Sequence, residues 1–301
     1  MTDNKLEKQT QNQKNDIIVS LTSYPARINT VHITIKSILN QSQKADKVIL
    51  WLAPEQFPNK EKDLPKELLA LTSDGLTIDW YKDVRSYKKL IPTLKLYSND
   101  IIITADDDVI YEHDWLERLY ISYEKNKDAI HCHRAHKIAL KNNKILPYSK
   151  WIWINNIKNN NSSYMMFFTG IGGVLYPPKC LHEDVLNEDK FTELCPMGDD
   201  IWFWGMAVLN NTPIKLVDNA IKCPTLIDGT QETALWKENV INNKNDIQIK
   251  NMISAYPEIL KKLKIEKKQV FYRKIENIMK SYLLFPYYLY KLNKIKKKFN
   301  N

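Results

Sequence analysis

Short apolar runs alternate with helical patterns through about the first 100 residues of the chain. The runs are rich in Ile, Val and Leu, which is typical of buried strands. They lie at residues 17–21, 48–52, 76–81 and 101–104. Residues 31–39 have apolar side chains at helical spacing, and we also expect helices over 64–71 and 87–97. This alternation predicts an α/β fold with an open, mainly parallel sheet flanked by helices.

The second part of the chain is less regular. Only seven glycines occur in the whole chain, and three of them lie within residues 170–173, where the backbone must turn or approach another group closely. Beyond Thr230 the pattern is helical. The other elements that we predict are a helix over 114–125, a strand over 129–133, a loop or hairpin over 146–157, a helix that opens within 196–204 and ends near Leu209, and a strand over 214–217.

Three consecutive carboxylates, Asp106, Asp107 and Asp108, follow the fourth predicted strand directly. Adjacent carboxylates repel one another and are costly in a half-buried place unless a cation neutralises them. On an extended backbone Asp106 and Asp108 point to the same side. Both can then reach one divalent ion whose other ligands are phosphate oxygens and water. An acidic surface turn is the alternative, although such turns rarely lie between Ile-Ile-Ile and Val-Ile.

The net charge of +9 is concentrated at the C-terminal end. Residues 261–301 hold 13 Lys and Arg against 2 Glu, whereas the rest holds 31 basic against 33 acidic residues. A nearly neutral body argues against nucleic-acid binding. The basic tail is also aromatic, and its longest uncharged run, Ser281–Tyr290, is too short to span a bilayer. Such a segment favours binding to an anionic membrane surface; packing on the body with a solvated Lys face is the alternative.

The cysteines and the N-terminal residues indicate the compartment. The four cysteines form no CxxC pair and are typical of reduced core thiols. Residues 1–15 are polar and lack the apolar segment of a signal peptide. We therefore expect a short disordered lead-in and a cytoplasmic protein.

Other phosphate-binding signatures do not fit the sequence. There is no G-x-x-x-x-G-K-[ST], and no G-x-G-x-x-G follows the first predicted strand, so neither a P-loop nor a dinucleotide fold is supported. The triplet is not an EF-hand loop, because Ile110 and Tyr111 occupy positions that need a ligand and a glycine. A cation at a strand end without a glycine cradle favours a nucleoside diphosphate held by a metal and by basic side chains.

A family resemblance follows from the order of these features. The strand–helix alternation, the acidic triplet, the segment Gly170–Gly173 and the sequence Gly198-Asp199-Asp200 resemble the GT-A fold of nucleotide-sugar glycosyltransferases. They are most similar to the broad family 2-like group of bacterial surface-polysaccharide and lipooligosaccharide enzymes, over roughly residues 16–246. The resemblance depends on the three motifs together and in this order, not on the DxD motif alone.

The resemblance implies a metal site at the triplet. Asp106 and Asp108 are expected to bind Mn²⁺ or Mg²⁺ at the donor diphosphate, with Asp107 near the ribose or the donor sugar. A metal stabilises the negative charge that the departing nucleoside diphosphate gains. Many family members add a late histidine to the metal, but none follows His182 here, and Asp228 is a conceivable substitute.

The resemblance also implies donor-binding residues at the ends of other strands. Thr22, Tyr24 and Arg27 are expected at the nucleobase and ribose. Asp83 is expected at a uracil edge, and Lys88 and Lys89 at phosphate. For each basic residue a solvated helix start is the alternative.

Gly198-Asp199-Asp200 resembles the acidic pair that carries the base in inverting family members. Inversion needs a carboxylate close to the acceptor hydroxyl, opposite the leaving diphosphate. The resemblance favours Asp200 as this base and leaves Asp199 open, and an N-cap is the alternative for either. Gly170, Gly172 and Gly173 resemble the segment that lines the donor-sugar pocket, with a β-bulge as the alternative.

Histidine and tryptophan residues supply weaker signals. The histidines of HCHRAH lack a second ligand pair of the spacing that zinc needs, so we expect ordinary polar positions, or a substrate contact. They are His131, His133 and His136. Four tryptophans offer flat faces to sugar rings, but we expect most of them in the core. They are Trp151, Trp153, Trp202 and Trp204.

Taken together, these features predict a metal-dependent glycosyltransferase on the inner face of the membrane. It would move a sugar, with UDP-sugar favoured, to a bacterial surface glycan or lipid-linked acceptor with inversion. Residues 16–250 would form the catalytic body and 251–301 a helical membrane-association segment. A sugar nucleotidyltransferase is the first rival, although its usual Gly-rich first loop is absent from residues 22–27. A non-catalytic membrane-docking protein on a degenerate transferase fold is the second.

Overall fold

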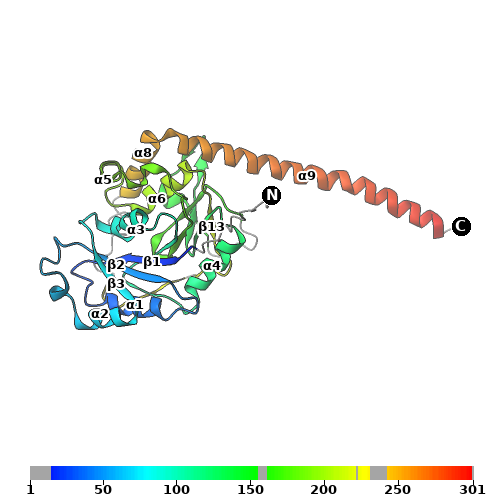
Figure 1. The fold of residues 1–301 in the computed structure, drawn as a ribbon. Coiled ribbons are helices and arrows are strands. Elements are labelled where there is room, and N and C mark those ends of the chain that lie inside the picture. Colours follow the sequence, from blue (N-terminus) through cyan, green and yellow to red (C-terminus); the bar gives the residue numbers. More distant parts are fainter. Residues whose placement is uncertain (1–14, 155–160, 222, 231–242, 300–301) are drawn as a thin grey trace, which may run out of the picture.

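A central sheet between two layers of helices forms the body, and a long C-terminal helix extends away from it (Figure 1). This computed structural model describes residues 15–154, 161–221, 223–230 and 243–299, with side chains of the last helix as far as Ile278. The predicted lead-in lies outside the described residues except for Asn15.

The central sheet has seven strands in the order β13-β6-β12-β4-β1-β2-β3. All neighbours are parallel except β12, which runs antiparallel to both β4 and β6. The predicted α/β class with a mixed, mainly parallel sheet is therefore confirmed. The strands are β1 (Ile17–Thr22), β2 (Lys47–Leu52), β3 (Leu76–Trp80), β4 (Ile101–Thr104), β6 (Ile130–Cys132), β12 (Val174–Tyr176) and β13 (Ile214–Leu216).

Both faces of the sheet are covered, which explains why its strands are continuous apolar runs. In β4, Ile101 and Ile103 pack in the cluster that contains buried side chains of α1, α2 and α4. The alternate residue, Ile102, packs on the opposite face with residues of α3 and α6. The bounds of these helices are α1 (Val31–Leu39), α2 (Lys66–Ala70), α3 (Ile91–Leu96), α4 (Trp115–Lys125) and α6 (Asp199–Leu209).

One predicted helix differs from the structure, and the stretch around the three close glycines divides into three elements. The helix expected over 87–97 is a 3₁₀ turn, Arg85–Lys89, followed by the short α3, because Pro92 in the first turn of α3 has no N–H to continue a hydrogen-bonded helix. The apolar stretch 165–176 divides at its glycines into β11 (Met166–Phe168), a 3₁₀ turn (Gly170–Gly172) and β12.

A second, three-stranded antiparallel sheet, in the order β10-β7-β11, was not predicted; only β10 lies within the loop or hairpin expected over 146–157. Its strands β7 (Ala135–Lys137), β10 (Ile152–Ile154) and β11 have three residues each, too few for a clear alternation. The remaining elements are β5 (Val109–Ile110), β8 (Leu140–Lys141), β9 (Lys144–Ile145), β14 (Thr225–Leu226), α5 (Glu188–Leu194), α8 (Lys244–Ala255) and the 3₁₀ turns Lys60–Asp63, Leu71–Asp74, Tyr148–Lys150 and Glu183–Leu186.

The histidines His131 and His133 are polar members of the core. His131 is held between Ser122 Oγ and the carbonyl of Asn126, at 2.8 Å from each. His133 contacts the carbonyl oxygen of Trp115 at 2.9 Å. Burial lowers the pKa of both imidazoles to about 4. Both positions are therefore ordinary polar positions, as expected.

The C-terminal helices α8 and α9 (Pro257–Phe299) begin on the body. Met252, Ile259 and Leu263 are buried in the same cluster as α6, so packing continues beyond residue 250, the boundary drawn from the sequence. After Leu263 the apolar side chains of α9 are exposed as far as Ile278. Among the described residues, no helix has the length and apolar character needed to cross a bilayer.

Candidate active site

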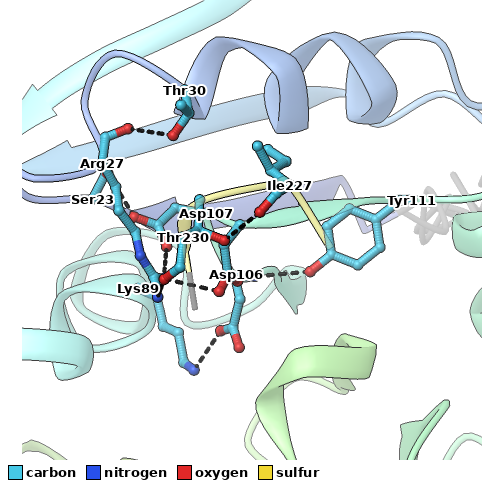
Figure 2. Close-up of polar contacts among 10 residues, drawn as sticks. Ser23, Arg27, Thr30, Lys89, Asp106, Asp107, Tyr111, Ile227 and Thr230 are labelled. Atoms are coloured by element: carbon cyan, nitrogen blue, oxygen red, sulfur yellow. Dashed lines mark hydrogen bonds and ion pairs between the residues drawn. The ribbon is translucent and has the colours of Figure 1, made fainter. Parts of the chain in front are cut away.

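The acidic triplet lies at the carboxyl edge of the central sheet. Ala105, just beyond β4, still follows the strand pairing, because its N–H donates to the carbonyl of Ser20 in β1 at 3.0 Å. The loop that leaves β1 brings Ser23 and Arg27 to Asp107 (Figure 2). Ligands of open α/β sheets bind at this edge.

Ser23, Arg27, Asp107 and Asp108 form one group, which we call the Arg27 cluster. Ser23, Asp107 and Asp108 are buried, and the side chain of Arg27 is 12% exposed. Arg27 Nη1 lies 2.6 Å from Asp107 Oδ1 and 3.1 Å from Asp108 Oδ2. Its Nη2 donates to the carbonyl of Thr230 at 3.0 Å, and Ser23 Oγ donates to Asp107 Oδ2 at 2.6 Å. Burial raises the pKa of Asp107, although Arg27 and Ser23 oppose the shift.

Backbone contacts hold the triplet in place. The N–H of Asp106 donates to the hydroxyl of Tyr111 at 2.8 Å (Figure 2). Tyr111 is itself packed against Trp115, with ring centroids 4.2 Å apart. The carbonyl of Asp108 accepts from Ile227 N at 2.9 Å, where β14 pairs with β5. Tyr111 thus orients Asp106, a role that no sequence pattern indicated.

Lys89 joins the triplet to the start of α6. Its Nζ lies 3.0 Å from Asp106 Oδ1 and 3.0 Å from Asp199 Oδ2. We call Lys89, Asp106, Asp199 and Asp200 the Lys89 cluster. Burial on its own would lower the pKa of Lys89, but the three carboxylates raise it well above the usual value. Lys89 is therefore a fixed cation and not a solvated helix start.

Gly170 closes the Lys89 cluster from the side of the glycine-rich segment. Its N–H donates to Asp200 Oδ2 at 2.9 Å. A Cβ at this position would lie 2.6 Å from Lys89 Nζ, 3.1 Å from Asp200 Oδ1 and 3.4 Å from Asp106 Oδ1. Only a glycine allows the backbone to approach these charged groups without displacing them.

Asp199 and Asp200 are the first two residues of α6, and Gly198 occupies the N-cap, so neither carboxylate is the cap. The side chain of Asp199 is 11% exposed and is paired with Lys89. Asp200 is partly exposed. Burial and repulsion by Asp199 raise the pKa of Asp200 to about 7, against the opposing effects of Lys89 and the N–H of Gly170.

The two carboxylates of the expected metal site, Asp106 and Asp108, pair with different cations. The carboxylate of Asp106 pairs with Lys89, whereas that of Asp108 pairs with Arg27. Within the described part of the chain, no three His, Cys, Asp or Glu residues are arranged to hold a metal ion. The arrangement does not fit a shared ion unless one of the two cations moves away. Metal binding by Asp106 and Asp108 stays a prediction, and no chemical step below depends on it.

The predicted donor-binding residues are already engaged to different extents. Thr22 Oγ1 donates to the carbonyl of Trp51 at 2.8 Å, and the ring of Tyr24 lies 5.7 Å from Arg27 Cζ. Asp83 is exposed and accepts from Gln56 Nε2 at 2.9 Å and from the buried Lys88. Lys88 pairs with Asp83. A contact with the donor stays a prediction for these residues.

Gly172 and Gly173 have a packing reason to be glycines. A Cβ on Gly172 would lie 3.2 Å from the backbone nitrogen of Arg134, and a Cβ on Gly173 would lie 2.5 Å from the Trp115 ring. Gly173 also has a φ of +85°. Gly170, not these two residues, faces the Lys89 cluster.

The small sheet brings Arg134 to Thr169, the neighbour of Gly170, whose N–H donates to Asp200. The carbonyl of Arg134 accepts from the N–H of Thr169 at 3.2 Å, next to Gly170. The histidines around Arg134 stand out in the sequence, but Arg134 itself was not predicted as a site residue, because its place depends on the pairing of β7 with β11.

No protein-family model matches the sequence, and no curated protein matches it. Among solved structures, S. aureus TarS 1–349 is similar at 12% identity over 81% of this chain and 72% of that chain, with a TM-score of 0.43. The structure of S. aureus TarS 1–349 in complex with UDP is similar at 11% identity over 69% of this chain and 59% of that chain, also with a TM-score of 0.43.

Proposed function

We propose that the protein is a glycosyltransferase that moves a sugar from a nucleoside diphosphate donor to a hydroxyl of a bacterial surface glycan or lipid-linked acceptor. UDP-sugar is the favoured donor. The main observation in support is that Asp106, after β4, and Asp200, at the start of α6, approach the same point beside Gly170. The motif order that resembles GT-A enzymes supplies the reaction type.

Asp200 acts as the general base in this proposal. Its carboxylate takes the proton of the acceptor hydroxyl while the acceptor oxygen attacks the anomeric carbon. The bond from that carbon to the diphosphate oxygen breaks, and the nucleoside diphosphate leaves with the electron pair. Attack from the face opposite the leaving group inverts the anomeric carbon.

Two observations favour Asp200 over Asp199 as the base. Asp199 is buried and paired with Lys89, so a hydroxyl would have to displace an ion pair to reach it. Asp200 is partly exposed and has a pKa of about 7, close to the value at which a base is both ionised and able to take a proton. Asp199 then orients Lys89 and raises the basicity of its neighbour.

A donor screen tests this function. Thermal unfolding is followed with UDP-, GDP- and CMP-sugars, each with Mn²⁺ and with EDTA. A donor at 100 times its Kd stabilises the folded state by about 2.7 kcal/mol, which shifts the melting temperature by several degrees. Release of nucleoside diphosphate from the stabilising donor is then measured, with Asp200→Asn as the inactive variant. No shift with any diphosphate donor would contradict the proposal.

The same assay separates the rivals. A sugar nucleotidyltransferase would release pyrophosphate from a nucleoside triphosphate and a sugar phosphate. A non-catalytic docking protein would show equal, background turnover in the wild type and in Asp200→Asn. Asp108→Ala does not separate these rivals, because Asp108 is buried beside Arg27 and its loss would also destabilise the protein.

We further propose that α9 associates with an anionic membrane surface. Beyond Leu263 its exposed apolar side chains accompany many lysines; the described ones are Ile265, Val270, Phe271, Tyr272, Ile275 and Ile278. Sedimentation with phosphatidylglycerol vesicles, and with phosphatidylcholine vesicles as the control, tests this. Binding should occur only to the anionic vesicles and weaken with salt. Equal binding to both would contradict the proposal.

A further inference from the structure

Arg134 is a cation beside the proposed base that the proposed mechanism does not use. It precedes β7, and its carbonyl accepts from the N–H of Thr169, whose neighbour Gly170 donates to Asp200. Asp200 and Asp106 are both close enough to act electrostatically on its guanidinium. Burial lowers the pKa of Arg134, and these carboxylates oppose the shift.

The guanidinium plane has a defined orientation. Arg134 Cζ lies 4.2 Å from the ring centroid of Trp153, a residue of the neighbouring strand β10. Stacking on an aromatic ring occupies a face of the guanidinium. The N–H donors lie in the plane and stay available for a forked contact with two oxygens of one anion. Trp153 is itself 42% exposed, so this edge of the small sheet is open to solvent.

Two buried polar atoms at this place lack a partner. Neither Arg134 Nε nor Thr169 Oγ1 has a hydrogen-bond partner among the residues that the structure describes. Ala135 pairs with Phe168 in the antiparallel ladder, which sets Arg134 opposite Thr169 with both side chains on one face. A buried donor without a partner is unfavourable, so a ligand that supplies oxygens here would remove this penalty.

The other basic residues of the site are already neutralised. Arg27 is paired with Asp107 and Asp108, and Lys89 with Asp106 and Asp199. Arg134 has no ion pair within 4.0 Å among the described residues. It is therefore the cation at this site that is available to an anionic ligand.

We propose that Arg134 and Thr169 form an oxyanion subsite that binds a phosphate group of a substrate beside Asp200. The substrate assignment rests on the proposed function, because a transferase of this kind offers two phosphate sources, the donor diphosphate and a phosphorylated acceptor. Trp153 orients the guanidinium, and Thr169 Oγ1 donates the second hydrogen bond. The phosphate is held and not cleaved by these residues.

Calorimetric titration of the full chain tests the subsite. The probes are UDP and, with UDP present, inorganic phosphate. Three variants remove one component each: Arg134→Met removes the charge and keeps the stem, Arg134→Lys removes the fork, and Thr169→Val removes the hydroxyl. Arg273→Met, on an exposed part of α9, makes the same change in net charge away from the site. Melting temperatures show which variants fold.

Loss of a charge-assisted hydrogen bond should weaken binding of the affected probe about tenfold or more in Arg134→Met. Arg134→Lys should recover only part of the loss, and Thr169→Val should show a smaller one. Weakened UDP binding assigns the donor diphosphate, and weakened phosphate binding with normal UDP binding assigns the acceptor. Arg273→Met should bind as the wild type does.

Unchanged binding of both probes in Arg134→Lys and Thr169→Val would overturn the subsite, as would failure of the wild type to bind either anion. Should Arg134→Met not fold, these two milder variants still decide the matter. The proposed function fails differently: no nucleoside diphosphate sugar would be turned over, while phosphate would still bind in a manner that depends on Arg134.

Discussion

The two carboxylate clusters at the edge of the sheet contain neighbouring residues of one triplet but differ in their surroundings. In the Arg27 cluster, the side chains of Asp107 and Asp108 are each 8% exposed and share one guanidinium. In the Lys89 cluster, Asp106 is 28% exposed and Asp200 is also partly open. The Arg27 cluster is largely buried and holds the structure together, whereas the Lys89 cluster is a charged site that a ligand can reach.

This difference follows from geometry and charge. The two terminal nitrogens of the Arg27 guanidinium contact two carboxylates and a backbone carbonyl, so groups of the protein itself already use these donors. Lys89 offers one ammonium to a site with three carboxylates. Burial, together with the excess negative charge, raises the pKa of Asp200. Adjacent residues of one motif can therefore serve stability and chemistry separately.

Replacing Asp200, in the Lys89 cluster, should have the largest effect of the changes considered, and this effect is on turnover. Asp200→Asn should lower turnover by two to four orders of magnitude, since it removes the general base. Because the pKa of Asp200 is raised in the folded state, its contribution to stability is lost as the pH rises through about 7. The variant should therefore be at least as stable as the wild type at pH 8.

Steady-state kinetics and thermal unfolding measure both effects. Asp189→Asn, an exposed aspartate in the first turn of α5, is the matched control and should keep normal turnover. Wild-type turnover in Asp200→Asn would remove Asp200 from the mechanism.

Replacing Arg27 should break the closed cluster. Arg27→Met leaves Asp107 and Asp108 buried without their cation, which should cost roughly 3 to 5 kcal/mol of unfolding free energy. Urea unfolding measures this. Arg118→Met, which removes an arginine from a more exposed ion pair on α4, should cost about 1 kcal/mol or less. Equal losses in the two variants would contradict the structural role of Arg27.

Replacing Lys89 should have a smaller effect on stability than replacing Arg27. Lys89→Met should cost roughly 2 kcal/mol at neutral pH, because the open carboxylates can take up protons. Lys89 lowers the pKa of Asp200, so its removal should raise that pKa further. The loss of stability should therefore shrink as the pH falls from 8 to 5.

Urea unfolding of Lys89→Met across this pH range measures the trend. Lys127→Met, on an exposed surface, should show little change at any pH. A loss that grows as the pH falls would contradict the open, proton-accepting character of the Lys89 cluster.

Gly170→Ala should have the smallest effect on stability. It tests the difference between the two clusters, because the added Cβ crowds only the Lys89 cluster. The added Cβ would push Lys89 Nζ and Asp200 Oδ1, and both are ends of side chains that can shift. We expect a loss of about 1 kcal/mol in stability and a larger relative loss in turnover. Gly75→Ala, at a φ of +109° far from the site, should lose stability but keep turnover.

Much of the fold follows from local pattern. The strands β1, β2, β3 and β4 match the apolar runs to within a residue or two, because a sheet covered on both faces needs continuous apolar strands. The small sheet of β10, β7 and β11 could not be predicted from local pattern, because strands of three residues are stabilised by partners far along the chain.

The sequence by itself determined the α/β class, the acidic triplet at a strand end and the pair Asp199 and Asp200, because each is a local pattern. Only the tertiary structure decided how the triplet is divided between Arg27 and Lys89, and why Gly170 faces the charged site. It also placed Arg134 beside Asp200 through the pairing of β7 with β11. Electrostatic roles depend on which charges become neighbours, and residues far apart in sequence become neighbours only through packing.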